Sequence, residues 1–128
     1  DLGVSKLAHA VAALVLEQRE AFDAHWRDIL AGARPVVEEH VAQMRADGLI
    51  EGELPNFGCM YFPRVVGVDD TRALTDWLWS EHGVVLPPGE FFGQAGHVRI
   101  GFGSGRLEAL DRGFVRLRAA LKAYPGRG

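Results

Sequence analysis

The sequence predicts an α+β fold: a small antiparallel or mixed sheet of about three strands covered by helices, preceded by one short and one long helix. Apolar residues recur at helical spacing in two stretches before residue 48 and in two stretches after residue 69. Between the later two, short apolar runs are separated by prolines and glycines, and residues 97–102 alternate apolar with polar or small side chains. The helical stretches and the short apolar runs together favour helices covering a small sheet.

The N-terminal part is expected to be entirely helical. Residues 4–16 form the short helix, with Ser5 as its N-cap. A longer stripe runs from about residue 17 to Gly48, a residue type that commonly ends helices. Pro35 lies inside this stripe, so we expect a bend or break near residues 32–35.

The middle of the chain is expected to hold the first strand and the third helix. Residues 49–56 are turn-like, and residues 58–67 read as a strand in which Pro63 forces an edge position or a bulge. The pair Asp69-Asp70 can cap a helix that ends at Gly83.

Two more strands and a final helix follow. Residues 84–86 are expected as a short strand and residues 97–102 as another. Ser104 is expected to cap the last helix, whose apolar stripe ends at Leu121.

Composition narrows the class of protein. A chain of 128 residues with 48% hydrophobic residues suits one domain with its own core. The net charge of −3 and the lack of a basic cluster argue against a nucleic-acid surface. The single cysteine, Cys59, fits a reducing compartment and reads as a small apolar filler, and no apolar run is long enough to span a membrane. We therefore expect a cytoplasmic protein.

The stretch from Gly83 to Gly103, GVVLPPGEFFGQAGHVRIGFG, contains the candidate functional residue. Val98, Ile100 and Phe102 share the core face of the last strand, which places Arg99 on the opposite face. A guanidinium there can bind a carboxylate through two parallel hydrogen bonds. The alternative is a structural ion pair with Glu90, Glu108 or another acid.

This order of residues resembles the C-terminal segment of class I/II aminotransferases, the fold-type I pyridoxal-phosphate enzymes. Their pattern runs from Gly-Val through Pro-Gly and Phe-Gly to a strand that carries an arginine. The resemblance implies that Arg99 binds the α-carboxylate of the substrate and that the loop 91–93 lies near the substrate entrance. It is strongest over residues 54–122 and weaker over residues 1–50.

The resemblance also implies a division of the chain and a set of partners. Residues 1–47 would be a helical segment connecting to a missing N-terminal large domain, and residues 48–128 the C-terminal small α+β domain. The full-length protein would be a homodimer that uses pyridoxal phosphate to transfer an amino group between an amino acid and a 2-oxo acid.

The cofactor site is not expected in this chain. Lys6 follows Ser5, as the Schiff-base lysine of the family follows a serine, but the glycine and arginine that should come next are absent and the segment is helical. We therefore expect no catalytic and no cofactor-binding residue here, and an isolated chain that is inactive.

Other chemistry has little support in the sequence. The five histidines include no pair four residues apart and none near Cys59, so we expect no metal site. Two other functions stay open. One is a stand-alone, non-catalytic binding or interaction domain of the same fold. The other is a fold-type I pyridoxal-phosphate enzyme with lyase or decarboxylase chemistry.

Overall fold

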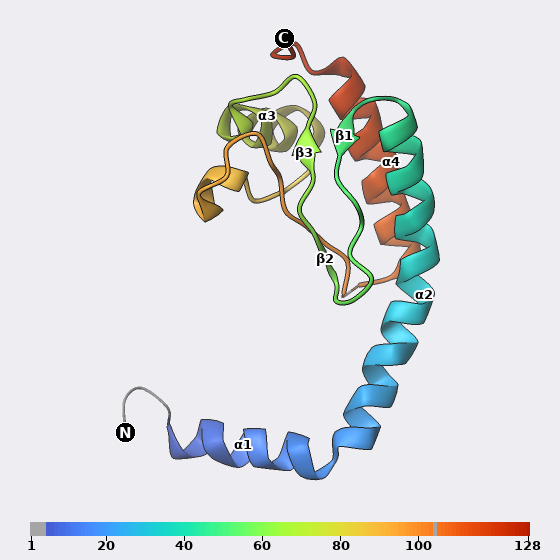
Figure 1. Ribbon diagram of the computed structural model, residues 1–128, viewed down its shortest axis with the longest axis vertical. Coiled ribbons are helices and arrows are strands. Elements are labelled where there is room, and N and C mark those ends of the chain that lie inside the picture. The colour runs from blue at the N-terminus through green and yellow to red at the C-terminus, as the bar shows by residue number, and fades with distance from the viewer. Residues whose placement is uncertain (1–4, 104) are drawn as a thin grey trace.

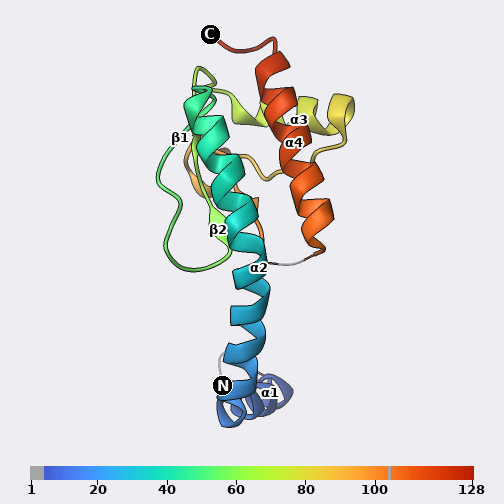
Figure 2. The same ribbon diagram turned by 90° about the vertical axis from the view of Figure 1, so that its right-hand side faces the viewer.

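The computed structural model describes residues 5–103 and 105–128. The elements are, in order, α1 (Lys6–Glu17), α2 (Arg19–Ala46), β1 (Ile50–Glu51), β2 (Met60–Tyr61), β3 (Arg64–Val65), α3 (Thr71–His82), the 3₁₀-helix η1 (Gly89–Phe92), β4 (Ile100–Gly101) and α4 (Leu107–Ala123). Figures 1 and 2 show α2 and α4 side by side, with the strands and α3 beside them. The predicted α+β fold class is confirmed.

Helix α1 and the first half of α2 extend away from the rest of the molecule. The Ser5 hydroxyl accepts a hydrogen bond from the Ala8 amide at 3.0 Å, so the predicted N-cap of α1 is correct. No residue of α1 is buried, and α1 together with the first half of α2 projects from the remaining elements (Figures 1 and 2).

Helix α2 runs without interruption through Pro35, so the predicted break does not occur. The helix does change direction along its length (Figure 1), which agrees with the bend that was the other expectation for a proline inside a helix. Its end follows the prediction: Gly48 has φ +69°, and the Leu49 amide donates to the Met44 carbonyl at 2.9 Å, which closes the last turn.

The strands are shorter and arranged differently from the prediction. They form two antiparallel pairs, β1 with β3 and β2 with β4. The single strand expected over residues 58–67 is split at Phe62 and Pro63, since proline has no N–H to continue the ladder. Residues 50 and 51, expected in a turn, are the strand β1 instead, and the Val66 amide donates to the Leu49 carbonyl at 3.0 Å beside it.

Of the two strands predicted later in the chain, the first is absent from the structure and the second is shorter than predicted. Residues 84–86 are not a strand, and the two prolines that follow them supply no N–H that could extend a ladder. The pairing moves to Pro88, which forms an isolated antiparallel bridge with Val98. The strand expected over residues 97–102 is reduced to β4 with that bridge and a second one between His97 and Arg64.

Helices α3 and α4 complete the core. Asp70 caps α3 by accepting from the Ala73 amide at 3.0 Å, and Gly83, with φ +63°, ends it, as predicted. Ser104, the expected cap of α4, lies outside the described residues. The core contains buried apolar side chains from α2, α3, α4 and the strands: Val37, Val41, Met44, Tyr61, Val65, Leu74, Leu78, Ile100, Phe102, Phe114, Leu117 and Leu121.

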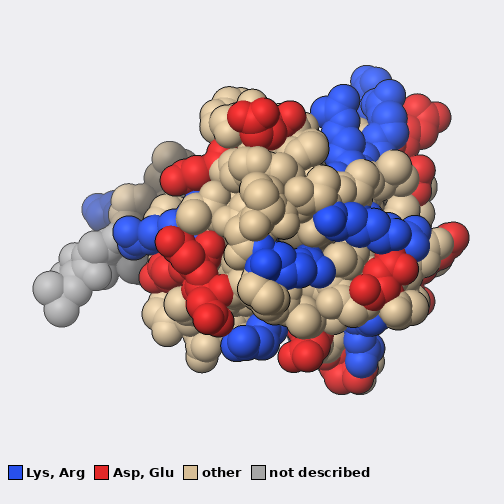
Figure 3. Space-filling view, turned by 90° about the horizontal axis from the view of Figure 1, so that it is seen from above, with Lys and Arg blue, Asp and Glu red and all other residues tan. Residues whose placement is uncertain are grey.

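The charged side chains do not gather by sign on the face seen in Figure 3, where acidic and basic groups are interspersed. Within the described part of the chain, no helix is both long enough and apolar enough to cross a bilayer.

Candidate functional site

Arg99 lies on a segment that is hydrogen-bonded on both sides. The Val98 amide donates to the Pro63 carbonyl at 3.2 Å, while the Arg99 amide donates to the Pro87 carbonyl at 3.0 Å. The Gly89 amide in turn donates to the His97 carbonyl at 2.7 Å. Residues 97–99 therefore run between two neighbouring segments. This pairing fixes the backbone from which the Arg99 side chain extends.

The turn before Arg99 depends on Gly89. A Cβ atom at this position would lie 1.9 Å from the Gln94 carbonyl oxygen and 2.7 Å from that of His97, so only glycine fits. The chain then forms η1, which ends at Gly93 with φ +74°. The tight turn leaves Phe91 and Phe92 exposed at the surface, 67% and 47% respectively.

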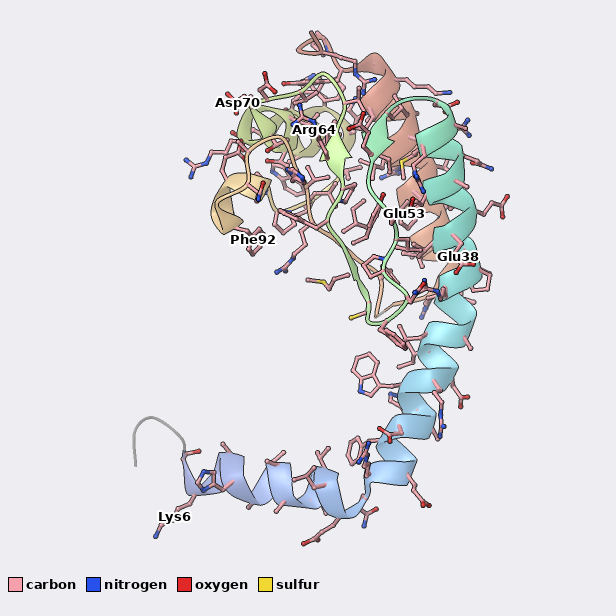
Figure 4. The ribbon with its side chains drawn as sticks, in the orientation of Figure 1. Lys6, Glu38, Glu53, Arg64, Asp70 and Phe92 are labelled. Atoms are coloured by element: carbon pink, nitrogen blue, oxygen red, sulfur yellow. The ribbon has the colours of Figure 1, made fainter. Side chains whose placement is uncertain are left out.

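The Arg99 side chain lines an open groove of about 630 Å³ between α3 and the segment 85–92. Its guanidinium carbon lies 5.1 Å from the centre of the Phe92 ring, a cation–π contact that uses none of the N–H donors. Figure 4 labels Phe92 at the outer edge of this region. Groove-lining residues also come from α3 and from the proline turn: Arg72, Thr75, Asp76, Trp79, Val85, Leu86, Pro87, Pro88 and Phe91.

Within residues 5–103 and 105–128, no carboxylate oxygen lies within 4.0 Å of the Arg99 guanidinium. Glu90, one of the acids that could have formed a structural ion pair, is bound elsewhere. It accepts hydrogen bonds from the Thr71 hydroxyl at 2.6 Å and from the Thr71 amide at 2.9 Å. The half-buried guanidinium of Arg99 therefore keeps donors available for a ligand.

Glu90 stabilises the groove by binding the first turn of α3. Burial is the largest single influence and raises the pKa of Glu90. The hydrogen bonds from the Thr71 hydroxyl and from backbone amides, those of Thr71 and Arg72 among them, together outweigh burial and hold that pKa below its usual value. The ionised carboxylate also suits the positive end of α3. Glu90 thus joins η1 to α3, the two sides of the groove.

A second arginine in the groove was not singled out from the sequence. The Arg72 guanidinium carbon lies 5.7 Å from the centre of the Phe91 ring. Arg72 occupies one face of α3 together with Thr75, Asp76 and Trp79, which follow at spacings of three, four and seven residues. The spacing of Arg72 and Trp79 on one face of the helix is the feature of the sequence that could have indicated this side of the groove.

Neither lysine of the chain lines this groove. Lys6 is on α1, far from Phe92 in Figure 4, and Lys122 forms an ion pair with Asp47 at 3.0 Å. The sequence-based prediction that the cofactor lysine lies outside this chain stays a prediction. The described residues include no group of three metal-ligating side chains.

Comparison with known proteins identifies the fold of this chain. No family model matches the sequence. The chain is 34% identical over 124 residues to capreomycidine synthase from Streptomyces vinaceus, in an alignment that covers 96% of this chain and 31% of that protein. It therefore spans about a third of the length of this curated relative.

Solved structures share the fold at lower identity. A PLP-dependent aminotransferase from Streptococcus suis superposes with a TM-score of 0.76 at 24% identity, over 96% of this chain and 32% of that one. Aspartate aminotransferase from Thermotoga maritima gives a TM-score of 0.69 at 24% identity, over 93% of this chain and 29% of that one. A Methanococcus jannaschii protein, described as similar in its active site to kynurenine aminotransferases, gives 0.66 at 23% identity, over 80% and 26%.

The chain has the fold of fold-type I pyridoxal-phosphate enzymes, as the resemblance in the sequence implied. The Streptococcus suis neighbour is itself described as PLP-dependent. This chain spans about a third or less of the length of each of these solved chains.

Proposed function

We propose that this chain is part of a pyridoxal-phosphate-dependent aminotransferase and that Arg99 binds the α-carboxylate of the amino acid and of the 2-oxo acid. The proposal rests on the surroundings of the Arg99 guanidinium. It lines an open groove, contacts an aromatic face, and has no carboxylate partner among the residues that the structure describes.

The groove would fix the orientation of the bound carboxylate. Arginine presents parallel N–H donors that match both oxygens of a carboxylate, which fixes the plane and direction of the bound group. The paired backbone at residues 97–99 keeps the base of the side chain in place, and the Phe92 ring covers one face of the guanidinium. Little rearrangement is needed to receive the carboxylate, so more of the interaction energy can orient the substrate.

The remaining chemistry belongs to the cofactor and to residues outside the chain. Pyridoxal phosphate supplies the electron sink that amino-group transfer requires when it is bound. In this proposal the segment 1–47 connects to a large domain that carries the cofactor lysine, while residues 48–128 form the small domain. The isolated chain would then bind carboxylates weakly and catalyse nothing.

The test uses the complete polypeptide that contains this chain. Transamination should be measured with a panel of amino acids and 2-oxo acids, in the original protein and in Arg99→Gln. A charge-assisted contact contributes about 1.5–3 kcal/mol, so kcat/KM should fall about 10- to 150-fold for substrates that carry an α-carboxylate.

The matched control is Arg112→Gln, which removes the same charge from the exposed surface of α4. This variant should keep the original kcat/KM. Equal activity of the Arg99→Gln and Arg112→Gln variants would contradict the proposed role of Arg99. A complete polypeptide that binds no pyridoxal phosphate would contradict the proposed enzyme class.

A second candidate function keeps the cofactor and the carboxylate site but changes the reaction. The curated relative is named a synthase and not an aminotransferase. Pyridoxal-phosphate chemistry that ends without a free 2-oxo acid therefore remains the alternative. It predicts consumption of an amino acid by the complete polypeptide with no requirement for a 2-oxo acid in the assay.

A further inference from the structure

A second groove, of about 610 Å³, lies between the segment 83–86, β4 and α4, and we call it the α4 groove. Arg99 does not line it. Its lining includes the partly buried side chains of Val84, Leu86 and Leu110 together with the core residue Phe114. The described part of the chain therefore leaves apolar surface open at this place.

The antiparallel pairing along one edge of β4 stops where the α4 groove begins. The Arg99 amide donates to the Pro87 carbonyl at 3.0 Å. In this register the next hydrogen-bonded pair would be Gly101 with Val85. Neither hydrogen bond of that pair is formed, although both residues line the groove. The ladder is therefore open at Gly101 and Val85.

Gly101 does not satisfy its backbone groups on the other side of β4. The amides of Val98 and Phe102 donate toward β2, to the carbonyls of Pro63 at 3.2 Å and Cys59 at 2.8 Å. Hydrogen bonding alternates along an antiparallel strand, so the N–H and C=O of Gly101 point away from β2 and toward the α4 groove. An unpaired strand edge of this kind is a template for a further strand.

Helix α4 presents a glycine to the same groove. Gly113 lies in the helix interior, where glycine is the least favourable residue after proline. A Cβ atom at Gly113 would meet no atom within 4 Å, so the packing of the described residues does not require glycine there. Glycine allows another backbone to approach closely, which suits a second main chain lying against α4.

One exposed cation lies beside this glycine. Arg116 also lines the α4 groove, three residues after Gly113 and thus on the same face of the helix. Among the residues that the structure describes, no carboxylate oxygen lies within 4.0 Å of the Arg116 guanidinium. Its donors can therefore accept an acidic side chain of a ligand.

We propose that the α4 groove binds an extended, acidic segment of a partner protein, which adds a strand to the free edge of β4. The main chain of this segment pairs with Gly101 and lies close to Gly113. Its alternate side chains are apolar and contact the lining, and an aspartate or glutamate pairs with Arg116. The main-chain hydrogen bonds supply affinity, and the side-chain contacts supply specificity. The proposal does not depend on the role of Arg99.

The experiment uses the complete polypeptide and a fluorescein-labelled peptide that alternates valine and glutamate and has both ends blocked. Fluorescence anisotropy should show binding to the original protein. Arg116→Gln should weaken binding about 10-fold or more through loss of the ion pair. Gly113→Leu should abolish it, because leucine suits the helix but fills the groove. Hydrogen exchange over residues 99–103, measured by mass spectrometry, should slow when the peptide binds.

Two altered peptides separate the parts of the interaction. A peptide with lysine in place of glutamate tests the charge, and one with a methylated backbone tests the main-chain pairing. Each should bind at least about 10-fold more weakly. The control variants are Arg27→Gln, at an exposed position of α2, and Val115→Leu, at an exposed position of α4 outside the groove. Both should bind the glutamate peptide as the original protein does.

The inference is overturned if the glutamate peptide does not bind, or if it binds Gly113→Leu as well as the original protein. Equal binding of the backbone-methylated peptide would mean apolar contact without strand pairing and would also overturn it. Slow exchange over residues 99–103 in the absence of peptide would mean that another segment of the complete polypeptide covers this edge, and the partner inference would fail.

Discussion

At the scale of single residues, the candidate site depends on the different hydrogen-bonding partners of Glu90 and Arg99. Glu90 is bound by Thr71 at the start of α3, whereas the Arg99 guanidinium lies over the Phe92 ring and pairs with no carboxylate among the residues that the structure describes. An acid two residues before Phe92 could have neutralised the arginine. Its use as a link between η1 and α3 leaves the guanidinium available.

Gly89 gives a prediction at this scale. In Gly89→Ala the new Cβ would overlap two backbone carbonyl oxygens, so the turn before Arg99 must shift. We expect a loss of about 2 kcal/mol or more in the free energy of unfolding, measured by urea denaturation, because the clash is with backbone and not with a movable side chain.

The control for this substitution is Gly113→Ala. Gly113 lies in the interior of α4, where an added Cβ would meet no atom within 4 Å. Alanine there should stabilise the chain by about 0.5–1 kcal/mol through helix propensity. If the two substitutions have effects of the same sign, the account of the turn is wrong.

The sequence could predict one of the two groove arginines. Arg99 follows from strand alternation and from the motif around it, both of which are local. Arg72 reads as an ordinary residue of an amphipathic helix, since its place in the groove follows from contact with Phe91, 19 positions later in the sequence. Contacts between distant segments are not recorded in a local pattern.

At the scale of elements, α2 and α4 are joined at one end by a small charged cluster. Asp47, which follows α2, accepts from the Arg118 Nε at 2.6 Å and lies 3.0 Å from the Lys122 Nζ. Hydrogen bonds from Arg118, and secondly from Lys122, lower the pKa of Asp47 from 3.8 to about 2. The ionised form of Asp47 is therefore favoured in the folded protein.

This shift predicts a pH dependence. A carboxylate with a depressed pKa stabilises the fold above its ordinary pKa of 3.8, and this stabilisation is lost as the pH falls through about 2. The original chain should be more stable than Asp47→Asn at pH 5, and the difference should shrink between pH 4 and pH 2.

Urea denaturation across this range measures the effect. Asp23→Asn is the control, because within the described part of the chain Asp23 pairs with Arg19 alone, one turn away on the exposed part of α2. The free energy of unfolding of Asp23→Asn should differ little from that of the original chain at every pH in this range. A difference for Asp47→Asn that does not change with pH would contradict the role of its charge.

Helices were more predictable than strands for a physical reason. The ends of α1, α2 and α3 are set by capping residues within a few positions, namely Ser5, Gly48, Asp70 and Gly83. Strand limits depend on partners far along the chain. Residues 84–86 have strand-like side chains but no continuous pairing, while Ile50 and Glu51 pair with β3 beside a turn-like sequence.

At the scale of the whole molecule, α1 and the first part of α2 expose apolar side chains that an isolated domain would be expected to bury. Leu7 is 74% exposed, Leu16 72% and Trp26 47%. Monomeric proteins rarely expose an apolar surface of this extent. Its position agrees with the proposal that residues 1–47 connect to a larger domain.

The 128-residue chain should therefore self-associate when produced alone. Leu7→Glu combined with Leu14→Glu should reduce the association seen by light scattering, because both leucines are exposed on α1. Val115→Glu, at an exposed position of α4, is the control and should leave association unchanged. A chain that stays monomeric at high concentration would contradict this prediction.

The role of Arg99 is tested most directly by a crystal structure of the complete polypeptide with a bound amino acid or an unreactive analogue. The account predicts that both carboxylate oxygens of the ligand accept hydrogen bonds from the Arg99 guanidinium at about 2.8 Å. A ligand carboxylate bound to another residue, with Arg99 paired to an acid of the protein, would contradict it.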